Sequence, residues 1–298
     1  MDENMATINN KLVQLSQPYN APAIEVVGRE EEMNAILAAW MGGDRMPFSP
    51  LLIGEPGVGK NRIVYECARI CSKELYTYQG HEDVTPEDFI CTVRISDDPD
   101  RKMDYIVRSL VTAMVRGGVY FLDGIAKIRS RALAPLESLL DERRYIDSDI
   151  LGERIDAHPG FRFIAATNPS DMEVNQLPDF IIDRMDPVIP FGCPNREEID
   201  RIVHRRYRIL GENGTLLVDQ FWKLWREKNG AKPPTPRDSI DIFGYALKLA
   251  NYKTVKHTRP LILETDGSPL PIKEEDLEKA FDIFFKKQER SQQCRLCR

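Results

Sequence analysis

Short apolar runs alternate with helically spaced apolar residues along the first two thirds of the chain. The apolar runs predict strands at 50–54, 74–79, 118–123, 161–167 and 187–191. Helical spacing predicts helices at 30–40, from residue 60 onward, near 103–116 and near 131–144. Strands that alternate with helices form βαβ units, so we expect an α/β fold with a parallel five-stranded sheet covered on both faces by helices.

The pattern changes after Pro190, where the strand-like runs stop. Helical spacing then predicts helices at 196–210, 216–228, 237–251 and 274–287. Asn195 and Glu198 form a capping-box pair that marks the start of the first of these helices. We therefore expect an αβα domain over residues 24–193 and a small helical domain over 194–290.

The two ends of the chain fit neither domain. Residues 1–23 are polar, contain two prolines and have only a short apolar pattern, so we expect an arm or a short helix there. Residues 291–298 are expected to be a flexible tail. Cys294 and Cys297 form one C-x-x-C pair in this tail, and a structural zinc site normally needs four ligands. We therefore interpret the pair as part of a free tail.

The composition is that of an ordinary soluble protein. The 298 residues are 42% hydrophobic and 30% charged, which argues against a disordered or membrane-embedded chain. A net charge of -6 disfavours nucleic acid as the main partner. No apolar run is long enough for a membrane span, and the first residues have no secretory pattern. Six scattered cysteines are too few for a disulfide framework, so we expect a cytoplasmic protein with reduced thiols.

The segment GEPGVGKN, residues 54–61, lies between a predicted strand and a predicted helix. Gly54, Gly59 and Lys60 have the spacing of the phosphate-binding loop G-x-x-x-x-G-K-[ST]. In such loops the glycines let backbone N–H groups surround phosphates, the helix N-terminus adds its positive dipole end, and the lysine reaches the β- and γ-phosphates. Asn61 replaces the Ser or Thr that normally binds Mg²⁺; its amide oxygen is an acceptable but bulkier ligand.

The predicted strand at 118–123 ends in Asp123. In phosphate-loop proteins an acidic residue at this strand end lies beside the loop and holds Mg²⁺, directly or through water. We therefore expect Asn61 and Asp123 to hold Mg²⁺ beside a bound nucleotide, which the resemblance described next implies to be ATP. The alternative is an aspartate that only ends a strand.

Several segments in a fixed order carry a more specific resemblance. The phosphate loop is followed by GHEDVTPEDF (80–89), GVYFLDG (118–124), AHPGFRFIAATNPSD (157–171) and IIDRM (181–185). This series resembles the AAA+ ATPases of the dynein-related and MoxR group, which includes the CbbQ and NorQ activators. The resemblance covers about residues 26–237 and implies a P-loop NTPase domain that binds nucleotide, followed by a helical lid.

The resemblance also implies roles for individual residues. It implies nucleotide contacts at Val27, Gly28, Glu55, Pro56, Gly57, Val58, Gly59, Lys60, Asn61 and Arg62. Asn168 resembles the polar sensor near the γ-phosphate, Arg184 the arginine finger offered to a neighbouring subunit, and Arg237 the second sensor. Residues 144–158 resemble a β-hairpin insert that often faces a pore or partner. The alternatives are that Asn168 is an ordinary turn residue, that Arg184 is the partner of an ion pair, and that Arg237 is a charge at a helix start.

Gly124 departs from this resemblance, because family members usually carry Glu after the strand aspartate to orient or deprotonate the attacking water. A general base typically contributes ~10²–10⁴-fold to the rate, so we expect slow hydrolysis unless another carboxylate substitutes. Glu82, Asp83 and Glu137 are the candidate substitutes. Restoring the carboxylate with Gly124→Glu is expected to raise turnover.

The resemblance further implies a ring, expected to be a hexamer, since an arginine finger acts on the nucleotide of a neighbour. It implies that ATP drives remodelling or activation of a protein partner, and relatives often work with a von Willebrand A-domain protein. The rival hypothesis is a catalytically impaired scaffold or regulatory subunit of a mixed ring. Gly124 and Asn61 favour the scaffold, whereas Arg184 and Asn168 favour a working ATPase.

Overall fold

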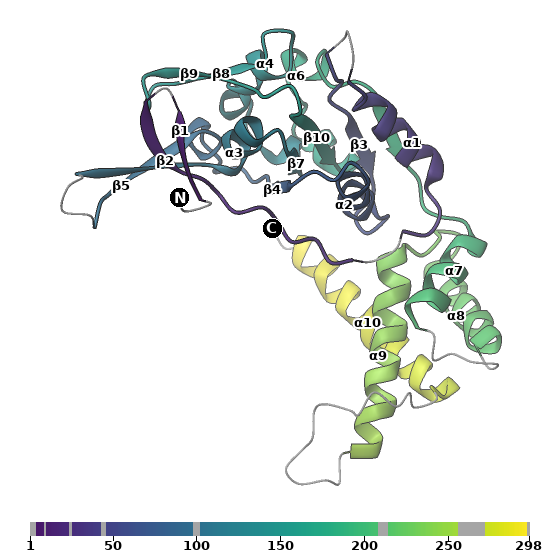
Figure 1. Cartoon of the computed structure of the whole chain (residues 1–298). Helices are drawn as coiled ribbons and strands as arrows, with labels where there is room; N and C mark the ends of the chain where they lie inside the picture. The colour runs from purple at the N-terminus through teal and green to yellow at the C-terminus, as the bar shows by residue number, and fades with distance from the viewer. Residues whose placement is uncertain are drawn as a thin grey trace. The chain divides into compact units, whose positions relative to one another are not determined.

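The structure is a computed structural model that describes residues 4–8, 10–23, 26–42, 46–97, 102–207, 214–255 and 272–296 (Figure 1). The chain divides into two compact units. The first comprises residues 1–56 and 60–192, and the second comprises residues 57–59 and 193–298. None of the described helices combines the length and the apolar character that a membrane span requires.

A parallel sheet forms the centre of the first unit. Its strands are β3 (Leu51–Gly54), β4 (Leu75–Gln79), β7 (Val119–Asp123), β10 (Arg162–Thr167) and β11 (Val188–Phe191). They lie in the order β11-β3-β10-β7-β4, and every neighbouring pair is parallel. All six residues of β10 are buried, as expected for a central strand covered on both faces. The predicted α/β fold with a parallel five-stranded sheet is therefore confirmed.

Helices pack against this sheet. The α-helices of the unit are α1 (Glu30–Ala39), α2 (Lys60–Ile70), α3 (Ser109–Arg116), α4 (Leu136–Leu139), α5 (Pro169–Val174) and α6 (Asp179–Ile182). Short 3-10 helices lie at Pro86–Asp88, Ile125–Lys127 and Ser130–Leu133. Helices α1 and α2 contact each other, and α3 packs on β4 and β7. The buried faces of α2 and α3 thus help to form the apolar core that holds the strands in place.

A second sheet in this unit corrects two predictions. Its strands are β1 (Met5–Ile8), β2 (Lys11–Gln14), β5 (Cys91–Ile95) and β6 (Met103–Val107), in the order β1-β2-β6-β5. The described part of residues 1–23 contains the strands β1 and β2 in place of the short helix that we allowed there, and the helix predicted near 103–116 begins only at Ser109. Burial alternates along β2, with Val13 fully buried and Leu12 47% exposed, which is the period of a strand rather than a helix.

The helix predicted near 131–144 is also wrong as a continuous element. The segment forms the 3-10 helix Ser130–Leu133 and the single turn of α4, with Pro135 between them. Proline removes a backbone donor and its ring clashes with the preceding turn, so a helix cannot run through this position undisturbed. The following segment does form a hairpin, in which β8 (Tyr145–Ser148) pairs antiparallel with β9 (Glu153–Asp156).

The second unit contains helices and no strand among its described residues. The helices are α7 (Arg196–Arg206), α8 (Gly214–Asn229), α9 (Pro236–Val255) and α10 (Glu274–Leu296). Phe221, Trp225, Phe243 and Phe281 are buried together in its core. Helix α10 continues to Leu296, so most of the expected tail from residue 291 is helical. The backbone at Cys294 belongs to this helix, whereas Cys297 lies outside the described residues.

Candidate functional site

The loop between β3 and α2 has a backbone shape that depends on its glycines. Gly57 has φ +90° and Gly59 has φ +106°, in the region that residues with a side chain rarely adopt. Lys60 begins α2, so the N-terminal N–H groups of this helix are next to the loop. A glycine-rich turn that leads into a helix N-terminus is the arrangement that binds anions in proteins.

The ammonium group of Lys60 lies inside this loop. Lys60 is only 5% exposed, and its Nζ donates to the carbonyl oxygens of Gly54 at 2.5 Å and Glu55 at 3.1 Å. It also donates to Asn168 Oδ1 at 3.0 Å. A buried charge is costly unless hydrogen bonds compensate it, and here three oxygens surround the ammonium. Two of the residues predicted from separate motifs are therefore in direct contact.

Asn168 lies directly after β10, the strand beside β3. Its Nδ2 donates to Asp171 Oδ2 at 2.9 Å, and Asp171 lies 3.8 Å from the Lys127 ammonium. Because Asp171 holds the NH2 end of the amide, the oxygen end is left to face Lys60. Asp171 was not predicted as a site residue, although its position three residues after Asn168 in the first turn of α5 is a recognisable signal.

Asn61 and Asp123 also meet, as the two motifs predict. Asn61 Nδ2 donates to Asp123 Oδ2 at 3.0 Å. Asp123 ends β7, which pairs with β10 on one side and β4 on the other. The described residues contain no cluster of three or more His, Cys, Asp or Glu side chains able to hold a metal. An amide oxygen and a carboxylate are nevertheless hard oxygen donors, and Mg²⁺ in phosphate-loop sites takes only one or two protein ligands.

Gly124 has a structural reason to be glycine. Its φ is +80°, and its N–H donates to the Ala166 carbonyl at 2.8 Å. On the other side, Gly80 N–H donates to the Asp123 carbonyl at 2.7 Å, and a Cβ at Gly80 would lie 2.5 Å from the Gly124 oxygen. The strand ends approach closely here because Gly80 lacks a side chain, whereas a Cβ at Gly124 would come no nearer than 3.2 Å, to the end of the Gln79 side chain. A glutamate at 124 therefore has to adopt a left-handed backbone conformation.

The three candidate substitutes for the missing glutamate occupy different places. Glu82 and Asp83 are exposed and follow Gly80, the residue bonded to Asp123, so their segment begins at the correct strand end. Glu137 lies on α4 with its Oε1 3.6 Å from Arg184. An ion pair with Arg184 gives Glu137 a structural role, so Glu82 and Asp83 are the better candidates.

Arg184 is held within its own unit. Its NH1 donates to the Phe180 carbonyl at 2.8 Å, and its Nε lies 3.6 Å from Asp141 Oδ2. The pKa of Asp141 is lowered, first by its hydrogen bond to Arg143 and also by the charge of Arg184. Arg184 thus forms the ion pairs of the alternative hypothesis within the single chain, and its role as a finger toward a neighbouring subunit stays a prediction.

The remaining predicted site residues are more scattered. Val27 is half-buried and Gly28 is buried with φ +72°, while Glu55, Pro56, Arg62 and Arg237 are exposed and Val58 is buried. Arg237 lies in the first turn of α9, where Thr235 and Asp238 form reciprocal capping bonds. It belongs to the second unit, so its role as a sensor stays a prediction.

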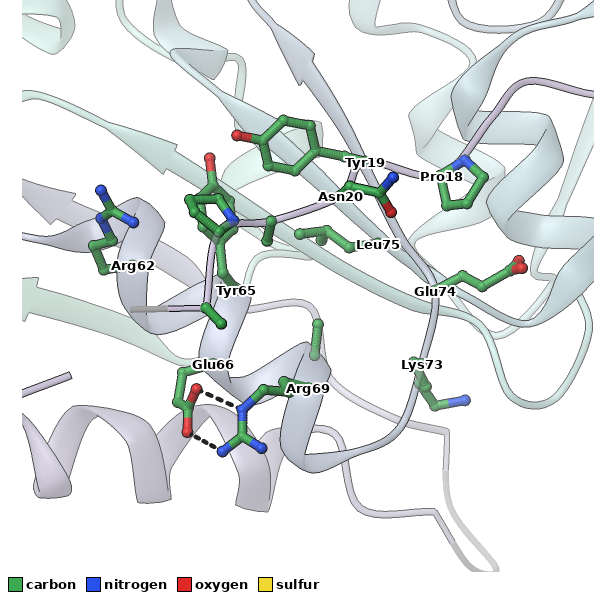
Figure 2. A pocket seen from close by; sticks show the side chains of 14 residues that line it. Pro18, Tyr19, Asn20, Arg62, Tyr65, Glu66, Arg69, Lys73, Glu74 and Leu75 are labelled. Atoms are coloured by element: carbon green, nitrogen blue, oxygen red, sulfur yellow. Dashed lines mark hydrogen bonds and ion pairs between the residues drawn. The ribbon is translucent and has the colours of Figure 1, made fainter. Parts of the chain in front are cut away.

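Tyr65 lies near this site and was not among the residues predicted from the sequence. It lies one helical turn after Asn61 on α2, and its ring centroid lies 5.3 Å from that of Tyr19. Burial and the neighbouring Tyr19 raise the pKa of Tyr65, so the phenol keeps its proton at neutral pH. Figure 2 shows Tyr19 and Tyr65 on one side of a pocket of about 340 Å³ between residues 18–23, α2 and β4. The signal in the sequence was its i+4 spacing from Asn61.

Comparison with known proteins identifies the domain that contains these residues. The family model described as "AAA domain (dynein-related subfamily)" matches residues 49–185. Residues 49–185 are thus an AAA domain of the dynein-related subfamily. The match includes Lys60 and Asn168, which are hydrogen-bonded to each other, and Asn61 and Asp123, which are also hydrogen-bonded to each other.

Similar proteins include the denitrification regulatory protein NirQ of Stutzerimonas stutzeri, 31% identical over 50% of this chain and 51% of that protein. Protein CbbQ of Hydrogenophilus thermoluteolus is 30% identical over 54% of this chain and 56% of its own length. These matches span about half the length of the relatives. A mutant of Thermotoga maritima RuvB has a similar fold, with a TM-score of 0.58, 20% identity and coverage of 87% of this chain and 71% of that chain.

The AAA domain is a nucleotide-binding domain of the P-loop ATPase class, which confirms the predicted resemblance to the dynein-related and MoxR group. The RuvB likeness concerns the fold alone. The roles of individual residues in this AAA domain rest on the geometry above.

Proposed function

We propose that the AAA domain binds ATP together with Mg²⁺ and hydrolyses the nucleotide slowly. The observation that carries this proposal is the convergence of Lys60, Asn61, Asp123 and Asn168 at the carboxyl ends of neighbouring parallel strands. Ligands of open α/β sheets bind at this end of the strands. The family match, which concerns a nucleotide-binding domain, supports the same assignment.

Each of these residues has a proposed task in holding the nucleotide. The backbone N–H groups of residues 57–61 and the helix start surround the phosphates, and Lys60 exchanges its bonds to loop carbonyls for bonds to phosphate oxygens. Asn61 and Asp123 hold Mg²⁺, which when bound neutralises charge on the phosphate oxygens. Asn168 keeps the Lys60 ammonium oriented and lies close enough to respond to the terminal phosphate.

Slow rather than fast hydrolysis follows from Gly124. No carboxylate follows Asp123 directly, and a missing general base costs typically ~10²–10⁴-fold in rate. Glu82 and Asp83, exposed just after Gly80, are the proposed source of the remaining activity. The second candidate function, a nucleotide-binding scaffold or regulatory subunit without hydrolysis, is favoured by the same observation. The two differ only in whether phosphate is released.

A steady-state phosphate-release assay on the purified chain and on Lys60→Ala separates the two functions. A slow ATPase releases phosphate from ATP above background, and Lys60→Ala removes that release because phosphate binding loses its charged partner. Release that is equal in both proteins would show a contaminating activity and contradict the proposal. Saturable ATP binding without release would establish the scaffold function instead.

We also propose that the chain works as a ring, with a hexamer as the expected form, and that it remodels or activates a protein partner such as a von Willebrand A-domain protein. Arg184 supports the ring through its resemblance to an arginine finger, since such a finger acts on the nucleotide of a neighbouring subunit; in the single chain it contacts Phe180, Glu137 and Asp141. Among the relatives, NirQ is named a denitrification regulatory protein, which supports a regulatory task. The name of CbbQ states no task. Native mass measurement with and without ATP tests assembly, and a monomer under both conditions would contradict it.

A further inference from the structure

Three positively charged side chains surround the turn of residues 158–161, which precedes β10. They are Lys73, Arg144 and Arg162, named here the basic turn cluster, and they follow α2, precede β8 and begin β10. The turn lies at the amino ends of β7 and β10, whereas the phosphate loop and its partners lie at the carboxyl ends of the sheet. The basic turn cluster is therefore separate from the nucleotide site.

The two arginines of this cluster share one acceptor. Arg162 Nη1 donates to the Phe161 carbonyl at 2.8 Å, and Arg144 Nη2 donates to the same oxygen at 3.1 Å. Arg162 Nη1 also donates to the Pro159 carbonyl at 2.8 Å, and Arg162 Nε donates to the Trp40 carbonyl at 2.6 Å. Arg162 is only 8% exposed, so a largely buried guanidinium lies beside a second one, and both are held by neutral oxygens.

Lys73 brings the third positive charge to the same turn. Its Nζ donates to the Gly117 carbonyl at 2.9 Å. A Cβ at Gly160 would lie 3.1 Å from this ammonium group, so the missing side chain of Gly160 leaves room beside it. Glu74, the next residue in the chain, binds Arg116 at 3.2 Å instead. Figure 2 accordingly shows Lys73 and Glu74 with no ion pair between them.

No carboxylate of the described residues neutralises the basic turn cluster. Its three side chains donate to backbone carbonyl oxygens and form no ion pair within that part of the chain. The pKa of Arg144 is lowered, first by burial and then by the charge of Arg162, and the pKa of Lys73 is lowered by the same two causes. Like charges held together in a partly buried place repel each other, and a bound anion would remove this repulsion.

We propose that the basic turn cluster is a binding site for a compact oxyanion of the phosphate class. Guanidinium groups bind oxyanions through forked pairs of N–H groups, and a lysine adds a point charge. A phosphate group carries more than one negative charge and several acceptor oxygens, which suits three separate cations better than the single charge of a carboxylate. The site needs no bound nucleotide, so the inference does not rest on the proposed function.

The test is equilibrium dialysis of radiolabelled inorganic phosphate against the full chain carrying Lys60→Ala, at constant pH and ionic strength. This background weakens phosphate binding at the loop, so the loop does not supply the signal. We expect saturable binding to a single site per chain. Adding Arg144→Gln or Lys73→Ala is expected to weaken it roughly tenfold or more, the size of one lost charged hydrogen bond. Acetate, a single carboxylate, is expected to compete much more weakly than unlabelled phosphate.

Arg143→Gln is the matched control. It removes the positive charge of the adjacent residue, which Asp141 already pairs at 2.7 Å, and is expected to change phosphate affinity by less than about twofold. Equal losses from Arg143→Gln and Arg144→Gln would show an effect of net charge alone and would overturn the proposal. Absence of saturable phosphate binding, or competition by acetate equal to that by phosphate, would also overturn it. Lys73→Ala leaves both arginines in place and decides the question if Arg144→Gln fails to fold.

Discussion

At the scale of residues, the site depends on the orientation of two amides. The sequence motifs predicted Lys60, Asn61, Asp123 and Asn168. Each of these residues lies at or shortly after the carboxyl end of a buried strand, and these strand ends share one edge of the sheet. Orientation of the side chains was not predictable in this way, since Asp171 holds the NH2 end of the Asn168 amide and Asp123 holds the NH2 end of the Asn61 amide. The Asp171 contact depends on a neighbour that carries no motif.

Gly124→Glu is the single substitution that tests most directly how the missing carboxylate affects ATP hydrolysis. The new carboxylate is expected to raise phosphate release at least about tenfold, within the range that a general base contributes. The left-handed backbone at this position, φ +80°, is expected to lower the free energy of unfolding by about 1–2 kcal/mol. Phosphate release and urea unfolding measure the two effects.

Gly124→Ala is the control for backbone strain. It is expected to lose similar stability with no gain in turnover, because it adds a Cβ at the same φ but no carboxylate. Equal turnover gains in both variants would contradict a catalytic role of the carboxylate. The same conclusion would follow from a folded, ATP-binding Gly124→Glu protein with unchanged turnover.

At the scale of elements, strands of the central sheet were predictable because they are continuous apolar runs, buried on both faces. The second sheet was not. Its strands β1 and β2 are four residues each and have one solvent-exposed face, so their apolar positions are too few to separate a strand from a short helix. Residues Met103–Val107 were assigned to a helix for the same reason, since a short run next to Ser109–Arg116 extends its apparent pattern.

The strand β2 allows a direct test of this correction. Val13 is fully buried, whereas its neighbour Leu12 is 47% exposed. Val13→Ala is expected to lower the free energy of unfolding by about 2 kcal/mol, since it removes buried methyl groups and leaves a cavity. Leu12→Ala is expected to change it by less than about 0.5 kcal/mol. Similar effects of the two substitutions in thermal or urea unfolding would mean that residues 11–14 are an unpacked arm.

At the scale of the whole molecule, the chain combines an AAA domain with a helical unit of four described helices. The helical unit was predictable from its capping residues and helical spacing, apart from the extension of α10 to Leu296. The ring and the protein partner are implied by the resemblance and stay predictions, because they depend on contacts between chains. The matched relatives are covered over about half their length, so their activities enter here only as proposals.

The central claim is that the loop around Lys60 holds ATP. Equilibrium binding of ATP to the purified chain, to Lys60→Ala and to Lys73→Ala tests it most directly. Lys73, whose Nζ donates to the Gly117 carbonyl at 2.9 Å, is a lysine of the same unit outside the loop. We predict saturable binding to the unmodified chain and to Lys73→Ala, and roughly 10–100-fold weaker binding to Lys60→Ala, the loss expected for charged hydrogen bonds. Equal affinity of all three proteins, or no binding by the unmodified chain, would contradict the account.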